Sequence, residues 1–384
     1  MEEDSYMPGC LNPVWPCALT GAVTALSGFS GIAVIIHGSS GCYFYPATLL
    51  HHDLHSTFLV EQEVIFGTSE RLVEVVKDLS RTYKKVAVVN SCVPSILGED
   101  IRDILSDYNI IFIDSPGFTG EFESGYLSAV KDLPVCMGQG TDRVNIEGIN
   151  LIDPFARGNQ REAERLLQLM GVPVGTIFCH DSYESLSSTA GFSVTVNPDL
   201  STGYGQELGS FLGLSAIKTT AYSIADRFCK AETRGIENEL LMVEERITKA
   251  ADKYLKRFDP PTAAIFSTCS YSGFAAATLQ KYLDADIVYC GSRNEPLISC
   301  TPATKVTSLA IIGSVIRGLA PDLVIGSSFE RSVAGDAAFI GLTPPIRGEF
   351  RLSSKPLAGT EGELSFMEDI LNACMDYQQR KLVK

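Results

Sequence analysis

The sequence has 384 residues, 45% of them hydrophobic, and a formal net charge of −15. A chain of this size outgrows a single hydrophobic core, so we expect two or three folded domains. The excess of acidic residues argues against a nucleic-acid partner, which needs clustered Lys and Arg. No run approaches the length of a transmembrane helix and residues 1–4 are acidic, unlike a signal peptide, so we predict a cytoplasmic protein with no membrane partner.

The first part of the chain alternates short β-rich runs with amphipathic helical runs, which is typical of parallel βαβ units. Its predicted strands are 32–36, 86–90 and 110–113, and its predicted helices lie near 21–27, 69–80 and 100–105.

The same alternation continues in two further blocks. The second starts near the apolar run 149–152 and has a helix at 160–170, strands at 176–179 and 193–196, and a long helix at 236–255. After the break Asp259-Pro260-Pro261, the third has strands at 263–266, 286–289 and 322–325 and helices at 274–283, 308–319 and 364–379. We therefore predict an α/β fold of three Rossmann-like domains, each a mostly parallel sheet flanked by helices, with boundaries 1–144, 145–258 and 259–384.

Three cysteines of the first block fall where elements meet. Cys42 and Cys92 each follow an apolar β-run, where a parallel sheet presents its carboxyl edge and sites in open α/β sheets usually lie. Cys17 precedes a helix. Three thiols brought to one edge from separate elements indicate an iron–sulfur cluster rather than a redox CxxC pair.

The other cysteines are interpreted mainly as ordinary thiols. Cys10 lies close enough to Cys17 to offer an extra ligand, but a thiol in the N-terminal tail is favoured. Cys269 follows the strand 263–266 at a carboxyl edge, so its alternatives are a core position and a role in a substrate or cofactor pocket. The remaining six are predicted to be buried core thiols: Cys136, Cys179, Cys229, Cys290, Cys300 and Cys374.

All five histidines lie at or before His180. On a helix, His51 and His55 would share a face at metal-ligand spacing, and near a redox centre the group with His52 could relay protons. A solvated or interface loop is the favoured alternative. His37 is expected to bond backbone in a turn after its strand rather than to react.

An ordered series of motifs resembles the nitrogenase component 1 superfamily. The series comprises Cys17 before a Gly-Ala helix start, His37-Gly38-Ser39-Ser40-Gly41-Cys42, Glu61-Gln62-Glu63-Val64-Ile65-Phe66-Gly67, Cys92 followed by Ile96-Leu97-Gly98-Glu99-Asp100-Ile101, and Ser115-Pro116-Gly117-Phe118-Thr119-Gly120. Weaker matches continue through Gly205-Gln206-Glu207-Leu208-Gly209 and Pro321–Glu330. This superfamily includes nitrogenase subunits, cofactor-assembly scaffolds and tetrapyrrole reductases.

The resemblance implies an iron–sulfur cluster, 4Fe–4S or larger, held near a subunit interface by Cys17, Cys42 and Cys92. It also implies pairing into a homodimer, or a heterodimer with a related subunit, and a separate P-loop iron-protein ATPase as electron donor. Three ligands per chain allow either one shared larger cluster or one cubane per subunit with a fourth ligand from elsewhere. The chain has no GxxxxGK[ST] loop, so we expect no ATP bound on it.

Two functions follow from the resemblance. In the first, the chain is the catalytic component of a nitrogenase-like ATP-dependent reductase, with a tetrapyrrole such as Ni-sirohydrochlorin a,c-diamide as a candidate substrate, although Cys17 departs from that branch. The absence of a histidine after His180 argues against dinitrogen reduction, because nitrogenase proper uses one in its C-terminal domain. In the second, it is a scaffold for assembly of a complex iron–sulfur cofactor; a noncatalytic paralogue subunit is a further alternative.

Overall fold

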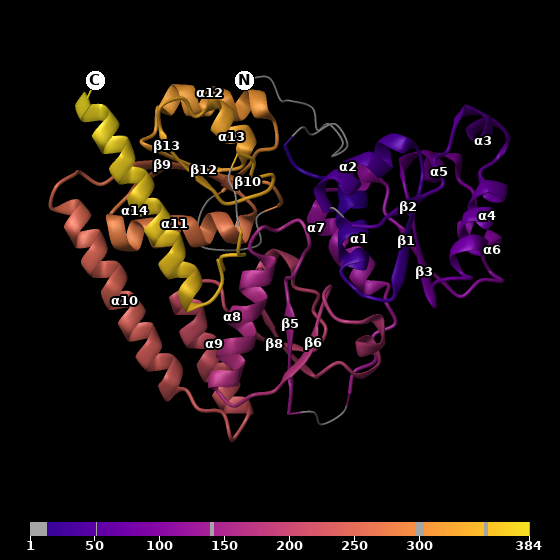
Figure 1. Cartoon of the computed structure of the whole chain (residues 1–384), viewed down its shortest axis with the longest axis horizontal. Helices are drawn as coiled ribbons and strands as arrows, with labels where there is room; N and C mark the ends of the chain where they lie inside the picture. Colours follow the sequence, from indigo (N-terminus) through magenta and orange to yellow (C-terminus); the bar gives the residue numbers. More distant parts are fainter. Residues whose placement is uncertain (1–13, 51, 139–141, 296–302, 349–351, 384) are drawn as a thin grey trace. The chain divides into compact units, whose positions relative to one another are not determined.

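The computed structural model describes residues 14–50, 52–138, 142–295, 303–348 and 352–383 (Figure 1). The chain divides into two compact units. Unit 1 comprises Met1–Met137, Asn150–Ile152 and Thr176–Thr189, and unit 2 comprises Gly138–Ile149, Asp153–Gly175 and Ala190–Lys384.

Unit 1 is built around a four-stranded parallel sheet with the order β2-β1-β3-β4. The strands are β1 (Ile32–His37), β2 (His55–Ser56), β3 (Lys85–Asn90) and β4 (Ile110–Asp114). The central strands pair from Ile32↔Lys85 to His37↔Asn90, so both reach the carboxyl edge at the same level. Three of the strands were predicted from their apolar runs, and the structure confirms them to within one residue.

Helices cover the apolar faces of this sheet. α4 (Ser69–Leu79) buries Leu72 and Val76 against Ile35 and Val88 of the sheet. Besides α1 (Ala18–Ser27), the unit also contains α2 (Ser40–Leu50), α3 (Glu61–Phe66), α5 (Cys92–Leu97), α6 (Ile101–Ile104) and α7 (Phe122–Lys131). Burying the apolar stripe of α4 is what its 3.6-residue pattern predicts.

α1 (Ala18–Ser27) is buried along its whole length and packs closely on α7. A Cβ atom at Gly21 would lie 1.8 Å from the carbonyl oxygen of Phe122, and one at Gly125 would lie 1.8 Å from that of Ala18. Only residues without a Cβ allow the two backbones to come this close. The contact fixes the first turn of α1, and with it the position of Cys17 just before the helix.

The second sheet has the order β6-β5-β7-β8, with β5 (Val144–Glu147), β6 (Val174–Ile177), β7 (Phe192–Thr195) and β8 (Gln206–Ser210). The second block was expected to start near the apolar run 149–152, and its first strand, β5, ends just before that run at Glu147. Its Asn145 and Glu147 interrupt the apolar pattern, yet both are buried and bonded. Asn145 Nδ2 donates to the Ala190 carbonyl at 2.9 Å, and a Glu147 carboxylate oxygen accepts from Thr202 Oγ1 at 2.8 Å.

The third sheet has the order β11-β10-β9-β12-β13, and all its strand pairs are parallel. Its strands are β9 (Thr262–Ser267), β10 (Asp286–Ser292), β11 (Thr304–Lys305), β12 (Leu323–Gly326) and β13 (Ala338–Gly341). The accompanying helices of unit 2 are α8 (Ala156–Leu169), α9 (Leu214–Arg227), α10 (Arg234–Leu255), α11 (Cys269–Leu283), α12 (Leu309–Leu319), α13 (Ser328–Val333) and α14 (Thr360–Val383).

Hydrogen bonds tie the start of α14 to helices α8 and α10 of unit 2. Asn159 Oδ1 of α8 accepts from the backbone N–H of Leu357 at 2.7 Å. Arg165 of α8 donates to Glu239 of α10 at 2.5 Å and to Thr360 Oγ1 at 2.8 Å. α14 is therefore anchored to two helices of the preceding block of the sequence.

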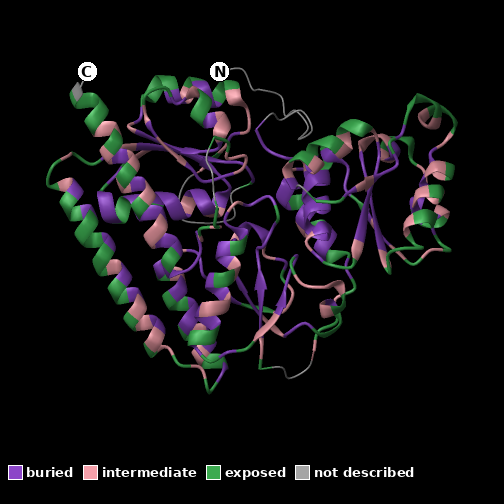
Figure 2. Ribbon diagram, viewed as in Figure 1, coloured by how far each residue is buried: buried purple, intermediate pink, exposed green. Residues whose placement is uncertain are grey.

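The predicted fold class is confirmed: parallel sheets are flanked by helices, and burial is concentrated in the strands and the inward helix faces (Figure 2). The boundaries 1–144, 145–258 and 259–384 stay a prediction, with one sheet for each segment although the contacts define two units. Across the described ranges, no helix combines the length and apolarity that a bilayer span requires.

Candidate functional site

Three half-buried thiols meet at the carboxyl edge of the first sheet. Cys17 directly precedes α1, Cys42 lies in the first turn of α2 after β1, and Cys92 is the first residue of α5 after β3. Burial raises the pKa of the Cys42 thiol, and the neighbouring Cys92 and Cys17 thiolates raise it further. Cys17 forms an antiparallel bridge with Glu121, and Gly117 of the same segment after β4 contacts Cys92, so the three cysteines lie at one sheet edge although they come from distant points of the sequence.

Polar groups surround the sulfur atoms. The backbone N–H of Gly117 donates to Cys92 Sγ at 3.1 Å, and Ser39 Oγ donates to Cys42 Sγ at 3.8 Å. Cys17 Sγ lies 4.0 Å from Thr20 Oγ1. Donors aimed at sulfur favour the thiolate over the thiol, and the hydrogen bonds from Ser39 and Ser91 partly offset the effect of burial on the pKa of Cys42.

Gly38 lets the ends of β1 and β3 approach. A Cβ atom there would lie 2.0 Å from Ser91 Oγ, whereas one at Gly41 would meet no described atom within 4 Å. The close approach at Gly38 is thus to the neighbouring strand end that leads into Cys92. Gly41 leaves room beside Cys42, which is consistent with a bulky group at the thiols.

His37 is fully buried at the end of β1 and bonds two hydroxyls, not the backbone as expected. Its Nδ1 lies 3.1 Å from Thr57 Oγ1, and its Nε2 lies 3.0 Å from Thr68 Oγ1. The Thr68 backbone N–H in turn donates to Glu99 at 2.8 Å. Burial lowers the pKa of His37 to about 4, although the Glu99 charge opposes the shift. The ring is therefore neutral near pH 7, and it connects the end of β1 to Thr57 and Thr68.

Sequence reasoning did not identify Thr57, Thr68 or Glu99 as part of this arrangement. Glu99 was noticed only within a family motif, and the two threonines gave no signal, because they come from separate loops that only the fold brings to His37. The less favoured alternative, in which His51 and His55 share a helix face, does not apply, because His55 lies in β2; His51 lies outside the described residues. The half-exposed His180 contacts Asp181 at 3.3 Å.

The remaining cysteines divide between core and surface. Cys179, Cys290 and Cys374 are buried, as predicted, but Cys136 and Cys229 are exposed, so the core prediction for these two was wrong. Both follow the end of a helix, in connecting segments where the chain returns to the surface. Cys10 and Cys300 lie outside the described residues.

Cys269 opens α11 at the carboxyl edge of the third sheet and is 8% exposed. Its backbone N–H donates to Asn294 Oδ1 at 2.8 Å. Burial raises the pKa of the adjacent Cys290 to about 11. This arrangement is that of a packed helix start, and the pocket role stays a prediction.

Large apolar side chains are exposed on α3 and on α5, the helix that begins with Cys92. Ile65 and Phe66 are 64% and 82% exposed, and Ile96 is 74% exposed. Single exposed apolar residues are ordinary, but several on two contacting helices mark an interaction surface.

The donor set suits a cluster better than a single ion. Within the described part of the chain, no group of three or more His, Cys, Asp or Glu side chains converges as one metal ion requires. A single ion draws all its donors to within about 2.3 Å of one point, whereas an iron–sulfur cluster spreads its thiolates around a larger body. Three spaced, half-buried thiols with room at Gly41 fit the second case.

Comparisons with known proteins agree on one family. The family model described as "Nitrogenase component 1 type Oxidoreductase" matches residues 17–375. The chain is 31% identical over 184 residues to the nitrogenase molybdenum-iron protein beta chain of Sinorhizobium fredii, which covers 42% of this chain and 36% of that protein. It is 23% identical over 309 residues to the nitrogenase iron-molybdenum cofactor biosynthesis protein NifE of Clostridium pasteurianum, covering 72% and 68%.

The fold agrees as well. A solved structure titled "Nitrogenase Cp1 at pH 6.5" superposes with a TM-score of 0.84 at 18% identity, covering 99% of this chain and 96% of that one. The sequence matches to beta chains are shorter: the aligned part spans 36% of the Sinorhizobium fredii protein and 39% of the one from Frankia alni.

Proposed function

The chain belongs to the nitrogenase component 1 type oxidoreductases, and from that premise we propose that it binds an iron–sulfur cluster through Cys17, Cys42 and Cys92. It acts as the catalytic component of an ATP-dependent reductase that receives electrons from a separate iron protein. The observation that carries the proposal is that α1, α2 and α5 each bring one of these cysteines to the same sheet edge, where the segment after β4 contacts both Cys17 and Cys92.

The chain's own residues hold and shield the ligands. A bound cluster would accept and release single electrons; the protein supplies soft anionic sulfur from the three thiolates. The Gly117 N–H and the Ser39 hydroxyl stabilise negative charge on Cys92 and Cys42. Loading releases the thiol protons to solvent, which the half-exposed position of the cysteines permits.

Two partners are part of the proposal. The exposed Phe66 and Ile96 lie on helices at the cysteine-bearing edge, and covering them removes apolar surface from water. They support docking of a paired subunit, identical or related, or of the electron donor at this edge. The sequence has no GxxxxGK[ST] loop, so the ATP-hydrolysing site is assigned to the separate iron protein.

The proposed substrate is organic. No histidine follows His180 in the sequence, whereas nitrogenase proper uses one in its C-terminal domain, so dinitrogen is not the proposed substrate. A tetrapyrrole such as Ni-sirohydrochlorin a,c-diamide is the candidate, and Cys17, which departs from that branch, leaves other unsaturated or thioether substrates open.

A second candidate is a scaffold on which a complex iron–sulfur cofactor is assembled. The specific support is the match to NifE, which extends over 72% of this chain, compared with 42% for the Sinorhizobium fredii beta chain. A scaffold would lose a labile cluster to an acceptor apoprotein, whereas a reductase would keep its cluster through repeated turnover. A noncatalytic paralogue subunit would do neither.

The test is anaerobic purification followed by iron and sulfide analysis and electron paramagnetic resonance. Cys42→Ala is expected to remove most of the iron and the cluster signal while circular dichroism shows a folded protein, because one of three ligands is lost. Cys136→Ala, which removes an exposed thiol away from the edge, serves as the matched control and should retain both. An unchanged spectrum in Cys42→Ala would reject the ligand assignment.

A further inference from the structure

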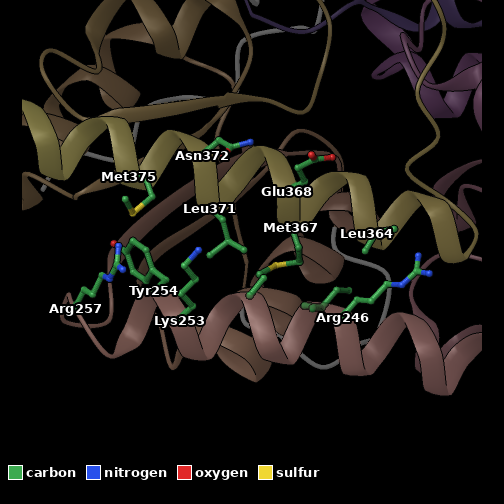
Figure 3. A pocket seen from close by; sticks show the side chains of 12 residues that line it. Arg246, Lys253, Tyr254, Arg257, Leu364, Met367, Glu368, Leu371, Asn372 and Met375 are labelled. Atoms are coloured by element: carbon green, nitrogen blue, oxygen red, sulfur yellow. The ribbon is translucent and has the colours of Figure 1, made fainter.

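Unit 2 contains a groove between α10 and α14 that the cluster chemistry does not use. Its volume is about 470 Å³, within the range of small-molecule sites. The floor is apolar: Ile247 and Tyr254 come from α10, and Met367, Leu371 and Met375 come from α14 (Figure 3). The three α14 residues recur every four positions, so they form one continuous stripe along that helix.

The rim of the groove is cationic. Arg246, Lys253 and Arg257 line it from the α10 side, and all three are exposed. The only acidic residue in the lining is Glu368. Lys253 and Arg257 lie at one end of the groove, with Arg257 in the turn just after α10, while Arg246 is about 11 Å from Lys253 along the helix axis. Figure 3 shows the same separation, with Arg257 beside Met375 and Arg246 toward Leu364.

Three acidic residues of α10 do not neutralise these cations, because each forms an ion pair with another residue. Glu245 pairs with Lys249 on the same helix at 2.5 Å, and Glu244 pairs with Lys281 at 2.6 Å. Glu239 pairs with Arg165 of α8. No described residue forms an ion pair or hydrogen bond with the side chain of any of the three rim cations. In a chain of net charge −15, this groove therefore carries three cations against the single carboxylate of Glu368.

We propose that this groove binds an elongated amphiphilic carboxylate. The acid group lies between Lys253 and Arg257, and the apolar body lies along the stripe of Met367, Leu371 and Met375 toward Arg246. Methionine and leucine side chains adapt to aliphatic bodies of differing shape, and a carboxylate supplies the charge that the rim lacks. The site is independent of the cysteines in unit 1.

Binding is measured with the intact protein and the fluorescent probe anilinonaphthalene sulfonate, an anion with an apolar body. Dodecanoate should displace the probe, and dodecanol, which has the same chain without the charge, should need about a tenfold higher concentration. Raising the salt concentration should narrow this difference, because the rim is exposed. Equal displacement by acid and alcohol would overturn the proposal.

Variants locate the site. Lys253→Gln with Arg257→Gln should weaken dodecanoate about tenfold and leave dodecanol unchanged. Lys249→Gln removes a charge from the same helix but outside the groove, so it should bind dodecanoate like the parent protein. Leu371→Asp places a negative charge on the floor and should abolish displacement by the acid. Unchanged binding in the double variant would overturn the proposal.

A final arm separates a free carboxylate from a lipid surface. Phosphatidylglycerol vesicles are sedimented with the protein in the presence and absence of dodecanoate. The proposal expects dodecanoate binding without vesicles and no co-sedimentation beyond that of phosphatidylcholine controls. Binding to anionic vesicles alone would overturn it in favour of a membrane surface.

Discussion

At the carboxyl edge of the first sheet, β1 and β3 lead into Cys42 and Cys92, whereas at the same edge of the third sheet β9 and β10 lead into Cys269 and Arg293. Cys92 and Cys269 occupy equivalent positions, each as the first residue of a helix after a parallel strand. Yet Cys92 is half-buried and Cys269 is buried.

The difference comes from what closes each edge. In the third sheet, Arg293 donates to Glu330 at 2.5 Å with both side chains fully buried, and Glu330 also accepts from the Ser327 N–H at 2.7 Å. Asn294 caps the start of α11 at the Cys269 N–H. In the first sheet, no such ion pair is found among the described residues at the thiols. One topology therefore yields a sealed edge and an open one, and the residues just after the strands decide which.

Breaking the sealed edge should have the largest effect. Arg293→Met leaves Glu330 buried without its cation, and we expect it to lower the free energy of unfolding by about 3–5 kcal/mol. Denaturant titration measures the change. Adding Glu330→Gln to Arg293→Met removes both charges and should recover part of the lost stability. As a control, Lys249→Gln breaks an exposed ion pair and should lower the free energy of unfolding by at most about 0.5 kcal/mol. A loss below that of the exposed pair would contradict the role assigned to Arg293.

At the open edge, the free energy of unfolding should depend on pH because of His37. In the folded chain burial lowers the pKa of His37 to about 4 from its ordinary value of 6.5, so below pH 6.5 the unfolded chain takes up a proton on this ring and the folded chain does not. Stability should consequently fall as the pH drops from about 6.5 to 4, by up to about 3 kcal/mol from this group.

Denaturant titrations across this pH window provide the measurement. His37→Gln has no titrating ring, and its stability curve should lose that part of the slope. If the parent protein and the variant lose stability in parallel from pH 6.5 to 4, the claim that His37 stays neutral in the folded protein is wrong.

A smaller effect is expected from the packing of the two strand ends. Gly38→Ala would bring a Cβ atom to 2.0 Å from Ser91 Oγ, and the required shift should cost about 1–3 kcal/mol and reduce iron content. Gly273→Ala in α11 meets no atom within 4 Å, so helix propensity should make it about 0.5–1 kcal/mol more stable. Thermal unfolding of both variants measures these changes. If Gly38→Ala were as stable as the parent protein, the strand ends would tolerate a side chain and the predicted clash would be wrong.

The sequence predicted what depends on local pattern and parallel pairing. Apolar runs gave β1, β3 and β9 nearly to the residue, and parallel strands necessarily bring the segments after β1 and β3 to one edge. It failed where burial is polar, as at Asn145 and Glu147 of β5, because their partners lie far along the chain. The hydroxyl partners of His37 were missed for the same reason.

The anchoring of α14 has a consequence for how the protein comes apart. Because Asn159 and Arg165 of α8 bind the segment that starts α14, and α14 also packs on β13, detaching α14 removes contacts both from α8 and from the third sheet. The second and third sheets, with their helices, should therefore unfold together as one cooperative unit although they share no strand. The first sheet, which carries the cysteines, has its own hydrophobic core and takes no part in the hydrogen bonds at the start of α14. We therefore expect it to unfold as a separate cooperative unit.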